Sequence, residues 1–135
     1  MSRRHVRVVG AMVEQAGGTY LITQRPETAS LPLLWEFPGG RVEEGESDEA
    51  ALVRELRELL GIEVIVGELA VQTHHAYPAY DVDFLVFRCT LPACGVEIRH
   101  LRARDHRWVR LEEMASYEFP KADAHTLATL LGLES

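Results

Sequence analysis

Two short apolar runs open the chain and predict a β-hairpin. Residues 6–15 read VRVVGAMVEQ and residues 19–25 read TYLITQR, both rich in β-branched residues, and the turn AGG separates them. Residues 26–34, PETASLPLL, contain two prolines and small polar residues. This composition is typical of a loop.

The hydrophobic period changes after the motif WEFPGG, and the new period predicts a helix over residues 47–60. Ser47 is a favourable N-cap, and Gly61 follows the last helical residue as a C-cap. Asp48 and Glu49 lie in the first turn, where the helix dipole favours acidic side chains. Placing residues at about 100° intervals separates two faces. One face is apolar and must contact the core; it consists of Leu52, Val53, Leu56 and Leu60.

The second half of the chain is mostly strand-like. Residues 63–77 and 80–91 predict two long strands joined at YPAY, and residues 106–111 predict a short one. Residues 111–115 are expected to form one or two helical turns, and residues 122–133 a closing amphipathic helix. The order of the elements predicts an α/β fold in which helices pack on the faces of a mixed sheet.

Composition adds the class of protein and the sign of its charge. The 135 residues suit one domain spanning 1–135, and 47% hydrophobic with 26% charged residues indicates a soluble globular protein. The formal charge of -7 disfavours a nucleic-acid polymer as partner, because phosphate backbones are bound by Lys and Arg. An anionic ligand would therefore need local positive charge or metal ions.

The cysteines and the hydropathy of the chain bear on its location. Cys89 and Cys94 suit a reduced protein better than a disulfide framework. The basic start of the chain lacks the apolar region of a signal peptide, and no segment is long and apolar enough to span a membrane. We therefore expect a cytoplasmic protein without a membrane partner.

The polar face of the predicted helix carries Arg54, Glu55 and Glu58, with the two acids as neighbours at i and i+3. Adjacent carboxylates repel each other but are good ligands for a hard divalent cation such as Mg²⁺; a solvated acidic face is the alternative. The PGG motif is expected to turn the backbone tightly and to expose carbonyl oxygens, and Arg54 is expected to orient one acid. Such a site would hold a pyrophosphate and activate water.

Residues 40–62 resemble the Nudix box, a 23-residue signature, in residue type and spacing. The matching positions are Gly40, Glu46 after five intervening residues, Arg54, Glu55 and Leu56 after seven more, and then Arg57, Glu58, Gly61 and Ile62. This chain departs from the box at one position, Leu59, where the family carries the second of two adjacent glutamates.

The similarity extends beyond the box. The segments LWEFPGG, LITQRP and FPKADAHTL are similar to the MutT-type branch of the Nudix family and to its CTP pyrophosphohydrolase relatives. The resemblance implies the Nudix α/β/α sandwich, with a mixed sheet packed between helices. It also implies hydrolysis of a nucleoside triphosphate, including modified ones of the nucleotide pool, to the monophosphate and pyrophosphate, with Mg²⁺ or Mn²⁺ as cofactor.

The same resemblance implies roles for residues of the acidic helix. Glu55 and Glu58 correspond to metal ligands, with the carbonyl of Gly39 as a further ligand. Glu55 also corresponds to a base for the attacking water. Arg54 and Glu46 correspond to the pair that orients the acids.

Substrate-binding residues follow from the same resemblance. Arg25 matches a phosphate-contacting arginine, and Asp123 matches the position that reads the edge of the base. The apolar base pocket is expected at Phe37, Tyr77, Val8 and Val82. Each has a structural alternative, since Arg25 could be solvated surface and the pocket residues could pack in the core. His74 and His75 are interpreted as structural, because adjacent strand residues point to opposite faces.

Two departures from the family pattern leave other activities open. Leu59 lies at the border between the acidic face and the apolar stripe, so it can widen the core while the metal site loses a ligand. Before RWV, many relatives carry a Glu-His pair where this chain has Arg102 and Ala103, and Arg102 could instead contact phosphate. Candidates for the shifted role are Asp105, Glu97 and His100.

The alternatives are a hydrolase of dinucleoside polyphosphates or nucleotide sugars, and a nucleotide-binding module whose catalysis Leu59 and Arg102 have weakened. In each case the expected partner is a nucleotide, bound by a monomer or a homodimer.

Overall fold

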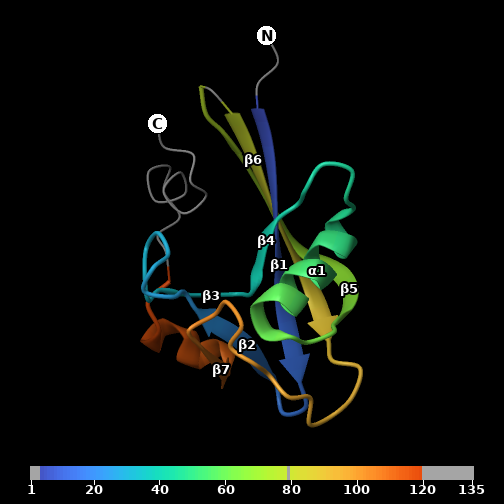
Figure 1. The fold of residues 1–135 in the computed structure, drawn as a ribbon, viewed down its shortest axis with the longest axis vertical. Helices are drawn as coiled ribbons and strands as arrows, with labels where there is room; N and C mark the ends of the chain where they lie inside the picture. The colour runs from blue at the N-terminus through green and yellow to red at the C-terminus, as the bar shows by residue number, and fades with distance from the viewer. Residues whose placement is uncertain (1–3, 79, 120–135) are drawn as a thin grey trace.

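The structure is a computed structural model that describes residues 4–78 and 80–119. Figure 1 shows a twisted sheet with one α-helix packed across it. The strands are β1 (Arg4–Gln15), β2 (Thr19–Gln24), β3 (Trp35–Glu36), β4 (Gly39–Arg41), β5 (Ile65–Ala76), β6 (Tyr80–Thr90) and β7 (Asp105–Val109). The helices are α1 (Asp48–Leu60) and the 3₁₀ helix η1 (Leu111–Ser116). The expected closing helix at residues 122–133, and with it Asp123, lies outside the described residues.

Strand β1 organises the sheet because it pairs with three other strands. The strand order is β3-β2-β1-β6-β5, with β4 paired to β1 and β7 paired to β2. β1 runs parallel to β6, in register from Arg4 opposite Tyr80 to Val13 opposite Cys89. The other strand pairs in the described part of the chain are antiparallel. The predicted mixed sheet is thus confirmed.

Most predicted elements match the structure. The strands expected at 6–15, 19–25, 63–77, 80–91 and 106–111 correspond to β1, β2, β5, β6 and β7. Residues 26–34 form a loop as expected, and the helical turns expected at 111–115 form η1. β3 lies within WEFPGG, and β4 begins in that motif and ends at Arg41; neither strand was predicted. They are too short to show a hydrophobic period and are defined by their pairing with β2 and β1.

Helix α1 begins and ends as the sequence predicts. Ser47 has an extended backbone, and its side chain accepts a hydrogen bond from the amide of Ala50 at 3.1 Å. Gly61 takes the left-handed φ of 66°, and its amide donates to the carbonyl of Arg57. The fully buried side chains of the helix are Ala51, Leu52, Leu56 and Leu60. Val53 is only partly buried but packs against the same core.

The main core lies between α1 and one face of the sheet. The sheet contributes buried side chains from β1, β2 and β6, among them Val9, Ala11, Val13, Leu21, Leu85 and Phe87. Leu59 is partly buried and packs against this cluster, so the prediction that it widens the apolar stripe is confirmed. A fully buried leucine stabilises the fold by about 1.5–3 kcal/mol, and Leu59 contributes part of that.

A second apolar cluster lies on the opposite face of the sheet. Side chains alternate along β6, so Val82 and Phe84 face away from Leu85 and Phe87. The cluster consists of the buried Val6 and Val82 with Val8, Tyr77, Tyr80 and Phe84 packed against them. Across the described residues, neither helix is long and apolar enough to cross a lipid bilayer.

Candidate active site

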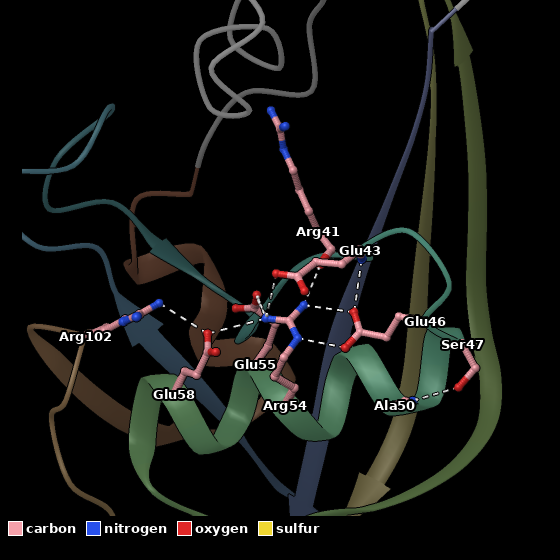
Figure 2. A network of polar contacts seen from close by, with 9 residues as sticks. All are labelled: Arg41, Glu43, Glu46, Ser47, Ala50, Arg54, Glu55, Glu58 and Arg102. Atoms are coloured by element: carbon pink, nitrogen blue, oxygen red, sulfur yellow. Dashed lines mark hydrogen bonds and ion pairs between the residues drawn. The ribbon is translucent and has the colours of Figure 1, made fainter.

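The guanidinium of Arg54 on α1 lies at the centre of an acidic cluster that consists of Glu46, Glu55 and Glu58 (Figure 2). It donates two hydrogen bonds to Glu46, from Nε at 2.8 Å and from Nη2 at 3.0 Å. Its Nη1 donates to Glu55 Oε1 at 2.9 Å and to Glu58 Oε2 at 3.4 Å. Nη2 also donates to the carbonyl of Arg41 at 3.0 Å. One planar cation therefore fixes three acids relative to one another and to β4.

Glu46 anchors this guanidinium from the turn before α1. Its Oε1 also accepts a hydrogen bond from the amide of Glu43 at 3.0 Å. The hydrogen bonds from Arg54 lower the pKa of Glu46, and the Glu46 carboxylate raises the pKa of Arg54. The geometry suits an orienting pair, while the role of the pair in catalysis stays a prediction. Glu43 itself, which sequence analysis did not include, lies 3.9 Å from Arg54.

The carboxylate of Glu55 is enclosed between α1 and β4. Its side chain is only 17% exposed. Burial raises the pKa of Glu55, while the hydrogen bond and the charge of Arg54 lower it. A carboxylate whose pKa is raised, yet which stays paired with a cation, is a stronger proton acceptor than a free one. The environment therefore suits the role of base that the family resemblance implies.

Gly39 and Gly40 let β4 pass close to β1 and α1. A Cβ atom at Gly39 would lie 1.9 Å from the carbonyl oxygen of Val9, and one at Gly40 would lie 2.4 Å from Cδ of Glu55. Both glycines are strand residues, and neither has a positive φ. The tight turn expected from PGG is not formed by its glycines, because Gly39 and Gly40 lie in β4, and the chain bends at Pro38 instead. Glycine is needed at both positions because they lack room for a side chain. The carbonyl of Gly39 as a metal ligand stays a prediction.

Arg102 contacts the acidic cluster from the loop that precedes β7. Its Nη1 donates to Glu58 Oε2 at 3.2 Å, as Figure 2 shows. The amides of Leu101 and Arg102 both donate to the carbonyl of Leu59 at 3.1 Å, which fixes the loop to the end of α1. Ala103 is buried in the main core. At the position where the family resemblance implies a glutamate, this chain therefore places a cation against Glu58.

The carboxylates of Glu55 and Glu58 suit a hard divalent cation. Oxygens of both residues contact the same Nη1 atom of Arg54, so they already converge on one positively charged group. Mg²⁺ prefers oxygen ligands and needs only one or two protein carboxylates. The donor set fits this ion. Leu59 packs against the core and adds no ligand.

The residues of the expected base pocket come together on the other face of the sheet. Val8, Val82 and Tyr77 belong to one apolar cluster. Phe37 lies near it, because its Cβ is 4.0 Å from the place of a Cβ at Gly10, which faces the same side of β1 as Val8. Val82 is fully buried, which favours the structural alternative for that residue.

Arg25 donates hydrogen bonds to the loop between β2 and β3. Its Nε donates to the carbonyl of Ser30 at 2.8 Å, and its Nη2 to the hydroxyl of the same residue at 3.1 Å. Its Nη1 lies 3.4 Å from Glu36. Burial raises the pKa of Glu36, and the charge of Arg25 opposes this rise. Arg25 thus has a structural role, and its phosphate contact stays a prediction.

His74 and His75 point to opposite faces of β5, in keeping with their interpretation as structural residues. His74 Nδ1 lies 2.6 Å from Oδ1 of the buried Asp83, which also contacts His5. The hydrogen bond from His74, together with that from His5, lowers the pKa of Asp83. His75 packs instead beside Tyr77, with 6.4 Å between the ring centroids.

Known proteins share this fold and its sequence pattern. The family model described as NUDIX domain matches residues 8–129. The CTP pyrophosphohydrolase of Escherichia coli is 38% identical over 135 residues, covering 96% of this chain and 94% of that protein. The 8-oxo-dGTP diphosphatase of Haemophilus influenzae is 31% identical over 134 residues, covering 97% and 95%. The solution structure of the E. coli ORF135 protein matches with a TM-score of 0.74 at 33% identity, covering 97% of this chain and 91% of that chain.

Proposed function

Because the chain belongs to the NUDIX family of hydrolases, we propose that it hydrolyses a nucleoside triphosphate to the monophosphate and pyrophosphate. The relatives described above as a CTP pyrophosphohydrolase and an 8-oxo-dGTP diphosphatase are named for substrates of this class. The cofactor is Mg²⁺, with Mn²⁺ as a substitute. The biological use is the removal of modified nucleotides from the pool.

The observation that carries the proposal is the convergence of Glu55 and Glu58 on one nitrogen of Arg54. Two carboxylates held at this spacing can bind the cation that a pyrophosphate also binds, with the Gly39 carbonyl as a further ligand. Bound there, Mg²⁺ would neutralise phosphate charge and lower the pKa of a coordinated water.

Residues of this chain supply the rest of the chemistry. Glu55 accepts the proton of the attacking water, and its partly buried carboxylate is suited to that task. Arg54 and Glu46 hold the Glu55 carboxylate in one orientation. The guanidinium of Arg102, beside Glu58, is in a position to meet the charge that develops on the phosphates.

The base of the nucleotide is proposed to bind on the opposite face of the sheet, near Val8 and Tyr77. Phe37 adds an aromatic surface there, and its ring meets that of Phe119 edge to face at 6.2 Å. Asp123 is proposed to read the edge of the base. An ionised aspartate only accepts hydrogen bonds, so it favours bases that present N–H groups, such as cytosine or an oxidised purine.

A panel of nucleotides tests the proposal directly. The full chain is incubated with canonical and modified nucleoside triphosphates in Mg²⁺, in Mn²⁺ and in EDTA, and the products are separated by chromatography. Monophosphate and pyrophosphate, formed only with metal, are the expected products. Release of a diphosphate and inorganic phosphate would contradict the proposed site of cleavage.

Two other functions remain alternatives to the hydrolysis of nucleoside triphosphates. Dinucleoside polyphosphates and nucleotide sugars contain the same pyrophosphate group, so turnover of these compounds alone would change the substrate class while keeping the chemistry. A nucleotide-binding module without hydrolysis is favoured by the ion pair of Arg102 with Glu58 and by Leu59 in the core. Nucleotide binding without product in any metal would establish that module.

We also propose a cytoplasmic location and a monomeric or homodimeric state. The two cysteines support a reducing compartment, since both are free and Cys89 is buried. Sedimentation of the purified chain would determine the oligomeric state.

A further inference from the structure

Three side chains that the proposed reaction does not use converge before and within β7. They are His100, Asp105 and His106, and one ligand atom from each lies within 4.8 Å of the others. Within residues 4–78 and 80–119, this is the one group of three or more His, Cys, Asp or Glu side chains that meets this spacing. Two imidazoles and a carboxylate are a ligand set for transition metals.

The distances are close to those of a coordination sphere. His100 Nε2 lies 2.8 Å from His106 Nδ1 and 3.9 Å from Asp105 Oδ1. In a tetrahedral zinc site with bonds of about 2.0–2.1 Å, ligand atoms lie roughly 3.3 Å apart. The imidazole nitrogens would therefore separate by about half an ångström and the carboxylate would approach by a similar amount. The ligand atoms of Asp105 and His106 lie within 4.8 Å of each other, so this pair would also have to approach through side-chain rotation.

The backbone holds the three residues in place from two sides. The amide of Arg99 donates to the carbonyl of Leu60 at 2.9 Å, and the amide of Leu101 donates to that of Leu59 at 3.1 Å. His100 therefore lies between two residues that are fixed to the end of α1. On the other side, Asp105 and His106 are the first two residues of β7, which pairs with β2. Adjacent strand residues ordinarily point to opposite faces, but the Asp105 carboxylate turns back to the amide of His106, so the two side chains still offer ligand atoms within 4.8 Å of each other.

The Asp105 carboxylate is also oriented by its own neighbours. Its Oδ1 accepts a hydrogen bond from the amide of His106 at 2.8 Å, and its Oδ2 lies 2.6 Å from Nη1 of Arg107. Contacts of this kind fix a ligating carboxylate in other metal sites. The charge of Arg107 opposes a cation, and it limits the affinity of the site.

We propose that His100, Asp105 and His106 bind a divalent transition-metal ion of the Zn²⁺ class, with one coordination position open to water. Imidazole nitrogen is a ligand for zinc, copper and nickel, whereas Mg²⁺ selects oxygen, so this site and the acidic cluster of α1 select different ions. The proposal does not rest on the proposed hydrolysis, because it concerns residues outside the acidic cluster. A bound ion would link His100, in the same loop as Arg102, to Asp105 and His106 of β7, and would thereby stabilise that loop.

Cobalt absorption tests the proposal without an activity assay. The metal-free full chain is titrated with Co²⁺, a coloured probe for zinc sites, in the Glu55→Gln, Glu58→Gln background that removes the competing acids. A visible absorption band that saturates at one equivalent, and that Zn²⁺ displaces, is expected. In a parallel titration followed by NMR, the imidazole signals of His100 and His106 should shift when Co²⁺ is added.

Substitutions separate this site from others on the chain. His100→Gln and His106→Gln should each weaken Co²⁺ binding by ~10-fold or more, the scale on which perturbed metal sites lose affinity. His100 is exposed, so its variant is expected to keep the fold. His74→Gln is the matched control, because His74 and His5 both contact the Asp83 carboxylate, but this trio is not among the described groups whose ligand atoms lie within 4.8 Å of one another. Equal Co²⁺ affinity with and without His100→Gln in the Glu55→Gln, Glu58→Gln background, or absence of the band from both proteins, would overturn the site.

Discussion

The carboxylate of Glu55 occupies the space in which a Cβ atom at Gly40 would lie, 2.4 Å from Cδ. The glycine is therefore part of the geometry of the acid, although it carries no functional group. Gly40→Ala should displace the flexible end of Glu55 rather than the backbone. We expect a loss in kcat of about 10²-fold, the scale of an ångström misplacement of a catalytic group, with little change in Tm.

Two neighbouring glycines serve as controls for that variant. Gly10→Ala adds a methyl group on the paired strand with ordinary contacts at 3.8 Å and beyond, and its Tm should stay near that of the wild type. Gly39→Ala would place a methyl group against the backbone of Val9 and should prevent the β1–β4 pairing. If Gly40→Ala unfolds the chain as Gly39→Ala does, the displaced group is not the Glu55 side chain.

Glu55→Gln should reduce kcat by at least ~10²-fold, because an amide cannot accept the proton of the attacking water. The substitution keeps the size of the side chain, so the fold should persist. Glu49→Gln is the matched control, an exposed acid of the same helix outside the cluster. Steady-state rates at saturating Mg²⁺ distinguish the two, and near-normal turnover of Glu55→Gln would refute the assignment.

The pH dependence of the reaction should report the contact between Arg54 and Glu55. Burial raises the pKa of Glu55 and Arg54 lowers it, so removing the cation in Arg54→Gln should raise that pKa further. Since the base form then appears only at higher pH, the acidic limb of the kcat profile should move to higher pH. Arg57→Gln, which breaks an exposed pair with Glu63, should leave the limb in place. A limb that stays fixed or moves to lower pH in Arg54→Gln would exclude Glu55 as the titrating base.

Leu59→Glu restores the family residue and should lower the metal concentration needed for half-maximal activity by ~10-fold, which corresponds to about 1.4 kcal/mol of binding. The metal-free variant should have a lower Tm, because Leu59 packs against the core, and added metal should reverse part of that loss. Leu59→Met keeps the volume without a carboxylate and controls for packing. Identical metal titrations of Leu59→Glu and the wild type would show that position 59 does not reach the metal.

Arg102→Gln should lower the half-maximal metal concentration by up to ~5-fold, because it removes a cation that competes for Glu58, and an exposed ion pair contributes at most about 1 kcal/mol. If Arg102 also contacts the phosphates, KM for the nucleotide should rise in the same variant. Arg104→Gln is the control, since Arg104 pairs with Glu27 instead. A metal requirement that increases in Arg102→Gln would show that Arg102 assists metal binding.

Local signals in the sequence predict α1 and much of the site. Ser47 and Gly61 mark the helix ends, and the spacing of the box alone places Glu55 and Glu58 on one face of the helix. β3 and β4 could not be predicted, because strands of two and three residues form only through their partners.

Contacts between distant parts of the chain could not be predicted from local sequence patterns. Glu58 and Arg102 are 44 residues apart, and no periodicity connects them. The glycines of PGG were visible in the sequence, but the reason for Gly40 is a tertiary contact with Glu55. The turn expected at these glycines is replaced by β4, whose pairing with β1 is likewise a contact between distant segments.

The parallel pairing of β1 with β6 constrains the order in which the chain folds. Arg4 is the partner of Tyr80, so the first strand cannot complete its hydrogen bonds until residues 80–90 have been synthesised. Pairing between such distant segments is slow, because the entropy of loop closure is lost before the contacts form. α1 and the antiparallel β5–β6 pair are local and should form sooner. β1, which is synthesised before its partner β6, is thus among the last of the described strands to have both of its edges covered.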